Sequence, residues 1–163
     1  MTHSARQDEA AATLRRIAFL LERESASRYR IAAFRKAAGA VETAEPERLE
    51  LLYRANRLAD LPDVGERTAG VVAEVFAARP VPYLEGLERA AVTEPGPGAG
   101  LRESLRGDLH SHTDASDGTT SMQEMVLAAL DLGHEYLAVT DHSPRLTVAR
   151  GLSADRLRVQ VAQ

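Results

Sequence analysis

The stretch that decides the fold of the second half of this chain is Gly107-Asp108-Leu109-His110-Ser111-His112, followed by Ser116-Asp117-Gly118 and Thr140-Asp141-His142. Side chains two residues apart in a β-strand project from the same face, so an extended segment over residues 107–112 directs His110 and His112 towards one site. A Ser-Asp-Gly turn directly after this strand brings Asp117 back to the same end. The combination predicts a site of nitrogen and oxygen ligands, suited to Zn, Mn or Fe.

A helix with marked ends is predicted after this turn, over residues 121–132. Ser121 and Glu124 have the spacing of a capping box, and Gly133 stands where a C-cap glycine is expected. Residues 136–140 then predict a buried parallel strand. Four apolar residues at helical spacing predict one stripe of the helix that packs against the sheet, namely Met122, Val126, Ala129 and Leu130.

The order strand, helix, strand brings the carboxyl ends of two parallel strands to one edge of a sheet. His142 follows the second strand, so we expect it beside His110, His112 and Asp117 as a fourth candidate metal ligand. Asp141 is the candidate catalytic residue of the site, either orienting His142 from behind or having no role.

On these three motifs, residues 107–157 resemble the start of a PHP (polymerase and histidinol phosphatase) domain. The resemblance implies a distorted (β/α)7 barrel, up to three divalent metal ions at the strand ends, and hydrolysis of a phosphate ester. By position it implies His110, His112, Asp117 and His142 as metal ligands. The family also has ligands beyond the T-D-H motif, and no histidine follows His142. We therefore expect a C-terminally truncated protein with two βα units of the barrel, inactive by itself.

Residues 1–92 predict an all-helical unit. Pro46 suits the first turn of one helix. The other predicted helices show apolar faces at helical spacing, formed by Leu14, Ile17, Ala18 and Leu21, by Ile31, Phe34, Ala38 and Val41, and by Val72, Val75 and Phe76.

The segment 61–69, Leu-Pro-Asp-Val-Gly-Glu-Arg-Thr-Ala, resembles a helix-hairpin-helix motif. Backbone N–H groups at the start of its second helix would bind nucleic-acid phosphates without reading sequence, which places Val64, Gly65, Arg67 and Thr68 at a DNA contact. Asp63 stands where the motif has glycine. It adds a negative charge and requires a backbone conformation that glycine adopts freely, so we expect weak DNA binding.

The wider segment, from about residue 5 to 87, is similar to the N-terminal domain of family X DNA polymerases. The resemblance puts the cations of a 5′-phosphate pocket on Arg30 and Arg67 and the pocket tyrosine on Phe34. The lysine that forms a Schiff base falls on Val71, which implies no deoxyribose-phosphate lyase activity. Arg35 and Lys36 are further candidate DNA contacts.

The predicted class is α plus α/β, with a helix-hairpin-helix domain over residues 1–92, a Pro/Gly-rich linker over 93–104 and the beginning of a PHP domain over 105–163. Residues 1–92 carry equal numbers of acidic and basic residues, and the net charge of −4 arises beyond them, so any DNA contact is local. The absence of cysteine, of a signal peptide and of an apolar span predicts a cytoplasmic protein without membrane contact.

Two functions remain open from the sequence. The first is a metal-dependent phosphoesterase, acting on DNA or a phosphorylated small molecule and coupled to a DNA-docking domain. The second is a non-catalytic DNA-binding or scaffolding module with a remnant PHP segment.

Overall fold

The computed structural model describes residues 3–91 and 98–162 and divides into two compact units, Met1–Glu94 and Pro95–Gln163. Most of the Pro/Gly-rich stretch assigned to the linker, residues 93–97, lies outside the described residues. Within the rest of that assignment, Ala99–Ser104 forms a short helix, α6, and the domain boundaries stay a prediction.

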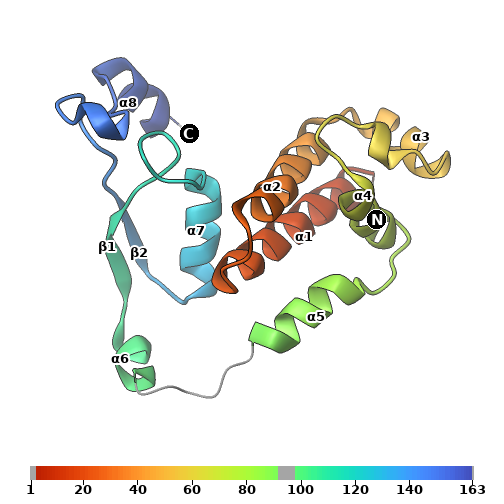
Figure 1. Ribbon diagram of the computed structural model, residues 1–163, viewed down its shortest axis with the longest axis horizontal. Coiled ribbons are helices and arrows are strands. Elements are labelled where there is room, and N and C mark those ends of the chain that lie inside the picture. The colour runs from red at the N-terminus through yellow and green to blue at the C-terminus, as the bar shows by residue number, and fades with distance from the viewer. Residues whose placement is uncertain (1–2, 92–97, 163) are drawn as a thin grey trace. The chain divides into compact units, whose positions relative to one another are not determined.

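The first unit is helical throughout, as predicted, and α1 and α2 lie side by side in it (Figure 1). Its elements are α1 (His3–Arg23), α2 (Arg28–Thr43), α3 (Pro46–Arg54), the 3-10 turn η1 (Leu58–Asp60), α4 (Glu66–Phe76) and α5 (Pro82–Ala91). The apolar faces expected from helical spacing form one core, in which Leu14, Phe34 and Val72 are buried. Pro46 occupies the first position of α3.

The segment predicted as a hairpin folds as η1, a tight turn and α4. The N–H of Val64 donates to the carbonyl of Leu61 across 3.1 Å, which closes the turn. Asp63 has φ 63°, the left-handed conformation expected where the motif has glycine. Gly65 is the N-cap of α4, where its N–H donates to Oγ1 of Thr68 at 3.0 Å. The identity of the segment as a DNA-binding hairpin stays a prediction.

The second unit contains a parallel two-stranded sheet with helices, which agrees with the predicted α plus α/β class (Figure 1). After α6 come β1 (Gly107–Ser111), α7 (Met122–Asp131), β2 (Tyr136–Val139), the 3-10 turn η2 (Thr147–Ala149) and α8 (Ala154–Val161). Both ends of α7 are as expected: Oγ of Ser121 accepts the N–H of Glu124 at 3.3 Å, and Gly133 has φ 75°. The barrel that the resemblance implied stays a prediction.

The predicted burial of the second unit is wrong in several places. On α7, Val126 and Leu130 are 43% and 65% exposed, although Ala129 is buried as expected. Tyr136 of β2 is 49% exposed, so this strand is not the buried strand that its apolar residues predicted. A sheet of two strands offers only a small apolar surface for these helices to cover, so apolar residues of α7 and β2 stay exposed.

No helix within residues 3–91 and 98–162 is both long enough and apolar enough to cross a membrane.

Candidate metal centre

Two parallel strands end at the candidate metal centre. His112 directly follows β1, and His142 lies three residues beyond β2. Because the strands pair in parallel, with Ser111 opposite Val139, both histidines emerge at the same edge of the sheet. The centroids of their rings are 4.5 Å apart.

A tight turn returns Asp117 to these strand ends. The carbonyl of Thr113 accepts the N–H groups of Ser116 and Gly118, at 3.1 and 2.9 Å. Gly118 passes so close to the preceding strand end that a Cβ atom there would lie 2.2 Å from the carbonyl oxygen of His112. Only glycine allows that approach, which explains the Ser-Asp-Gly sequence of the turn.

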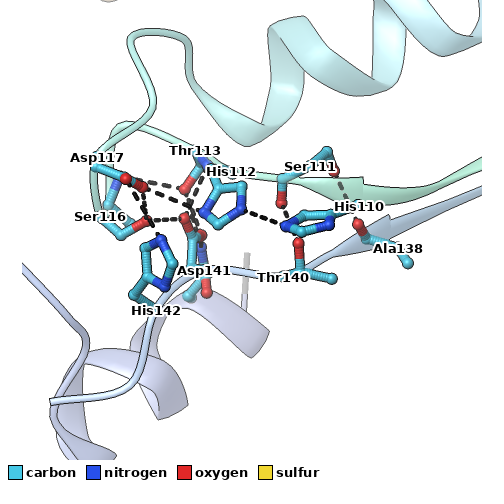
Figure 2. Close-up of polar contacts among 12 residues, drawn as sticks. His110, Ser111, His112, Thr113, Ser116, Asp117, Ala138, Thr140, Asp141 and His142 are labelled. Carbon is cyan, nitrogen blue, oxygen red and sulfur yellow. Dashed lines mark hydrogen bonds and ion pairs between the residues drawn. The ribbon is translucent and has the colours of Figure 1, made fainter. Parts of the chain in front are cut away.

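The structure brings together His112, Asp117 and His142 (Figure 2), whose potential ligand atoms all lie within 4.8 Å of one another. Asp117 lies between the two imidazoles: its Oδ1 is 3.2 Å from Nδ1 of His112, and its Oδ2 is 3.4 Å from Nε2 of His142. One carboxylate and two imidazole rings therefore lie close together where the two strands end.

The chemistry of this group fits a divalent cation. Nδ1 of His112 is buried and has no hydrogen-bond partner among the described residues, so its contact with Asp117 is close without being a directed hydrogen bond. Two ligands on one tetrahedral zinc ion, each about 2.0–2.2 Å from it, stand roughly 3.3–3.6 Å apart. The two spacings across Asp117 are near that value, and the buried nitrogen would gain a partner.

His110 stands beside this group rather than in it. Its Nε2 is 2.9 Å from Nε2 of His112, within hydrogen-bonding distance, and the tautomers of the two rings decide which nitrogen donates (Figure 2). The same-face placement expected from the H-x-H spacing is therefore present. The role of His110 as a metal ligand stays a prediction, because His110 lies outside the group of converging ligand atoms.

The environment of Asp117 favours its charged form. Burial alone would raise the pKa of this carboxyl. Hydrogen bonds from the Ser116 hydroxyl and the N–H of Asp117 itself, followed by the charges of His142 and His112, hold that pKa below its ordinary value. An ionised carboxylate is the form that a metal ligand requires.

Asp141 has hydrogen bonds to the turn and to α8. Its Oδ1 accepts the N–H of Thr113 at 2.8 Å and the hydroxyl of Ser116, while its Oδ2 accepts the hydroxyl of Thr113 and Nε2 of Gln160, both at 2.6 Å. Burial would raise the pKa of Asp141, but these hydrogen bonds from Ser116, Thr113 and Gln160 lower it to about 2. Four donors leave this carboxylate little capacity to accept a further ligand.

The depressed pKa of Asp141 predicts a pH-dependent contribution to stability. The contribution is present above the ordinary value of 3.8 and is lost as pH falls through about 2. Allowing for solvent screening of this incompletely buried group, we expect it to be about 1 kcal/mol. Urea unfolding followed by far-UV circular dichroism should show a stability gap between the unmodified chain and Asp141→Asn that narrows from pH 5 to pH 2. A difference in stability that stays constant from pH 5 to pH 2 would contradict the lowered pKa of Asp141.

In the first unit, two of the predicted DNA contacts meet on a tyrosine. The guanidinium carbons of Arg30 and Arg67 lie 5.5 and 5.6 Å from the ring centroid of Tyr83. Arg30 also donates to the hydroxyl of Tyr83, and the ring of Phe34 stacks on that of Tyr83 with centroids 5.6 Å apart. Both arginines are exposed, so two positive charges are held close together at the surface.

Other predicted DNA contacts are less available. Arg35 forms an ion pair with Glu22 at 2.6 Å, and its side chain is largely covered. The N–H groups of Val64 and Gly65 already have partners within the turn, and Thr68 is buried. Lys36 is exposed. Val71, at the position of the family's lysine, is buried in the core.

Two residues that contact the candidate sites were not predicted from the sequence. Tyr83 follows Pro82 at the start of a helix, and only its contacts with Arg30 and Arg67 mark it out. Gln160 is buried against Asp141, although an amide on a short amphipathic helix is expected to face solvent. No sequence signal was available for either residue, since each acts through contacts between distant segments.

Residues 108–158 match the family model of the PHP domain, the family that the three motifs resemble. A stretch of 59 residues is 48% identical to the protein named DNA polymerase/3'-5' exonuclease PolX of Bacillus subtilis (strain 168). That stretch is 36% of this chain and 10% of the relative, so the chain spans a small part of the relative it matches. No solved structure matches the chain significantly.

Proposed function

We propose that this chain contributes a divalent metal site to a phosphoesterase of the PHP type and docks on DNA through its helical unit. The observation that carries the proposal is the Asp117 carboxylate, which lies between the imidazoles of His112 and His142 at the ends of two parallel strands. These three residues would hold the cation, with His110 as an adjacent ligand. Zn, Mn and Fe all suit such a set.

A divalent cation at this site would lower the pKa of a bound water and neutralise charge on phosphoryl oxygens. The chain's own contribution is to hold one carboxylate in its charged form and to keep Nδ1 of His112 without a hydrogen-bond partner. The substrate class is a phosphate ester. The relative's name includes a 3'-5' exonuclease, which supports a DNA end as substrate, and a phosphorylated small molecule is the other candidate.

Hydrolysis of a generic phosphodiester such as bis(p-nitrophenyl) phosphate tests the catalytic part. With added Mn²⁺ or Zn²⁺, turnover by the unmodified chain that is lost in His112→Ala would support the phosphoesterase, although the incomplete ligand set predicts little turnover by this chain alone. His134→Ala makes the same substitution outside the ligand group and should retain turnover. No turnover from the unmodified chain, together with DNA binding, would favour the alternative of a non-catalytic DNA-binding or scaffolding module.

The DNA-docking part is supported by the Arg30–Tyr83–Arg67 cluster. A ring that contacts both guanidiniums limits their motion, so a phosphate placed between them would cost less side-chain entropy than two free arginines would. Because the first unit has no excess of positive charge, this local pair is the feature that favours a nucleic-acid backbone as partner.

Removal of both arginines should weaken DNA binding and change its salt dependence. For Arg30→Ala/Arg67→Ala, we expect the slope of log affinity against log salt to fall in magnitude by up to about 2, since each lost phosphate contact removes roughly 0.9. Fluorescence anisotropy with a labelled duplex oligonucleotide measures it. Arg48→Ala/Arg79→Ala removes the same charge from exposed positions and should leave the slope nearly unchanged. Equal losses in both double variants would show that net charge alone governs binding.

A further inference from the structure

The described contacts of α8 fasten it to the turn that carries Asp117. Arg156 donates from its guanidinium to the carbonyls of Ala115, Arg150 and Gly151. Gln160, one helical turn further, donates from Nε2 to Oδ2 of Asp141 at 2.6 Å and to Oγ1 of Thr113 at 3.1 Å. Residues four apart lie on one side of a helix, so the two side chains form one polar face directed at the turn.

This docking reverses the orientation that the apolar residues predict. Leu157 and Val161, which are four residues apart and so share one face of α8, are 50% and 78% exposed, while Gln160 is 8% exposed. A buried amide is costly unless its hydrogen bonds are made, and those of Gln160 end at residues 113 and 141. The position of α8 is therefore set by polar contacts to the turn rather than by an apolar core.

From Gln160 the contacts continue to Asp117. Asp141, which accepts from Gln160, also accepts the hydroxyl of Ser116. Ser116 directly precedes Asp117 in the turn, and its Oγ is 3.2 Å from Oδ1 of Asp117 (Figure 2). Thr113 and Ser116 are each 1% exposed, so the part of these contacts that lies within the turn is shielded from water. Groups that hydrogen-bond a metal ligand from behind fix its orientation and its affinity for the metal.

We propose that Gln160 is a positioning residue for the metal centre: through Asp141 and Ser116 it holds the turn over residues 113–117 so that Asp117 faces His112 and His142. The inference rests on the proposed metal site and adds α8 to it. In this proposal Asp141 does not orient His142. It links the turn to α8, since its carboxylate oxygens accept hydrogen bonds from both.

The experiment is a Co²⁺ titration of the intact chain, with affinity from competition against a chelator and the visible absorption of the bound ion as a report on its ligands. Gln160→Met keeps the volume of the side chain and removes its donors. We expect it to lower Co²⁺ affinity about 10- to 100-fold and to alter the absorption spectrum, because Asp117 loses its fixed orientation. Gln123→Met makes the same change at an exposed position of α7 and should bind like the unmodified chain.

The outcomes separate the inference from the proposed function. If the unmodified chain binds Co²⁺, His112→Ala does not, and Gln160→Met equals the unmodified chain in affinity and spectrum, the metal site stands and the role of Gln160 is overturned. A lower melting temperature with unchanged affinity and spectrum likewise assigns Gln160 to stability alone. No Co²⁺ binding by the unmodified chain overturns both proposals. Should Gln160→Met lose helical signal, Ser116→Ala interrupts the same contacts and is judged by the same two readouts.

Discussion

Replacement of Asp117 by alanine is expected to weaken binding of Zn²⁺ or Mn²⁺ more than about a hundredfold. Loss of a residue that only supports a ligand typically costs 10- to 100-fold, and Asp117 is the carboxylate within the ligand group itself. Without it the cation would meet the rings of His112 and His142 with no anionic partner between them. Equilibrium dialysis with metal quantification by mass spectrometry measures the affinity.

Asp114→Ala provides the matched control for Asp117→Ala. Asp114 is an exposed acidic residue in the same turn, and it lies outside the group of converging ligand atoms. It should therefore retain nearly full affinity. Equal weakening in the two variants would mean that the turn attracts cations by its general negative charge, without a defined site.

Gly118→Ala is expected to disrupt the metal centre without touching any ligand. The added Cβ would lie 2.2 Å from the carbonyl oxygen of His112 and 2.6 Å from that of Thr113. Both are backbone atoms next to β1, so the turn itself must open, and Asp117 moves with it. We expect a loss of about 1–3 kcal/mol in the stability of the second unit, as for other overpacked sites, and a metal affinity reduced at least about tenfold.

Thermal unfolding by circular dichroism and the same dialysis measure the two effects of Gly118→Ala. Gly100→Ala is its control, because a Cβ at Gly100 of α6 meets nothing within 4 Å. That substitution should leave metal affinity unchanged and stability equal or slightly higher, since alanine is the better helix former. Normal metal binding by Gly118→Ala would show that the turn tolerates a wider conformation than the one described.

The helical unit follows from its sequence because each helix buries one apolar face. Leu14 and Ile17 on α1, and Ile31 and Phe34 on α2, are each three residues apart, and all four are buried. The same reasoning placed the ends of α7, where Ser121 and Gly133 have backbone roles that few other residues fill. Such features can be predicted because they depend only on residues that are near one another in the sequence.

Burial in the second unit could not be predicted in the same way. Helical spacing shows that Val126 and Leu130 share a face, as do Leu157 and Val161. It does not show whether another element covers that face, and all four residues are exposed. For α8 the polar contacts of Arg156 and Gln160 outweigh the apolar face, and those contacts depend on where the turn after β1 lies.

In the candidate metal centre, some features were predictable from the sequence and others were not. Convergence of His112, Asp117 and His142 was predictable because strand ends, a Ser-Asp-Gly turn and a parallel pairing fix it. The partners of Asp141 were not, since Thr113 and Gln160 are ordinary residues far apart in the sequence. Likewise, Arg30 and Arg67 were expected at a phosphate, but the tyrosine that contacts both was not.

The bonds made by Gln160 also bear on the order in which this protein is assembled. Its contact with Thr113 joins positions 47 residues apart, and the one with Asp141 spans 19. A ribosome therefore releases the histidines and Asp117 well before the helix that braces them. Closing so long a loop carries an entropy cost that local contacts do not, which places completion of the turn late in folding. A cation that arrives before α8 has docked would meet an open, weakly binding turn, so metal uptake should follow the docking of α8 rather than guide it.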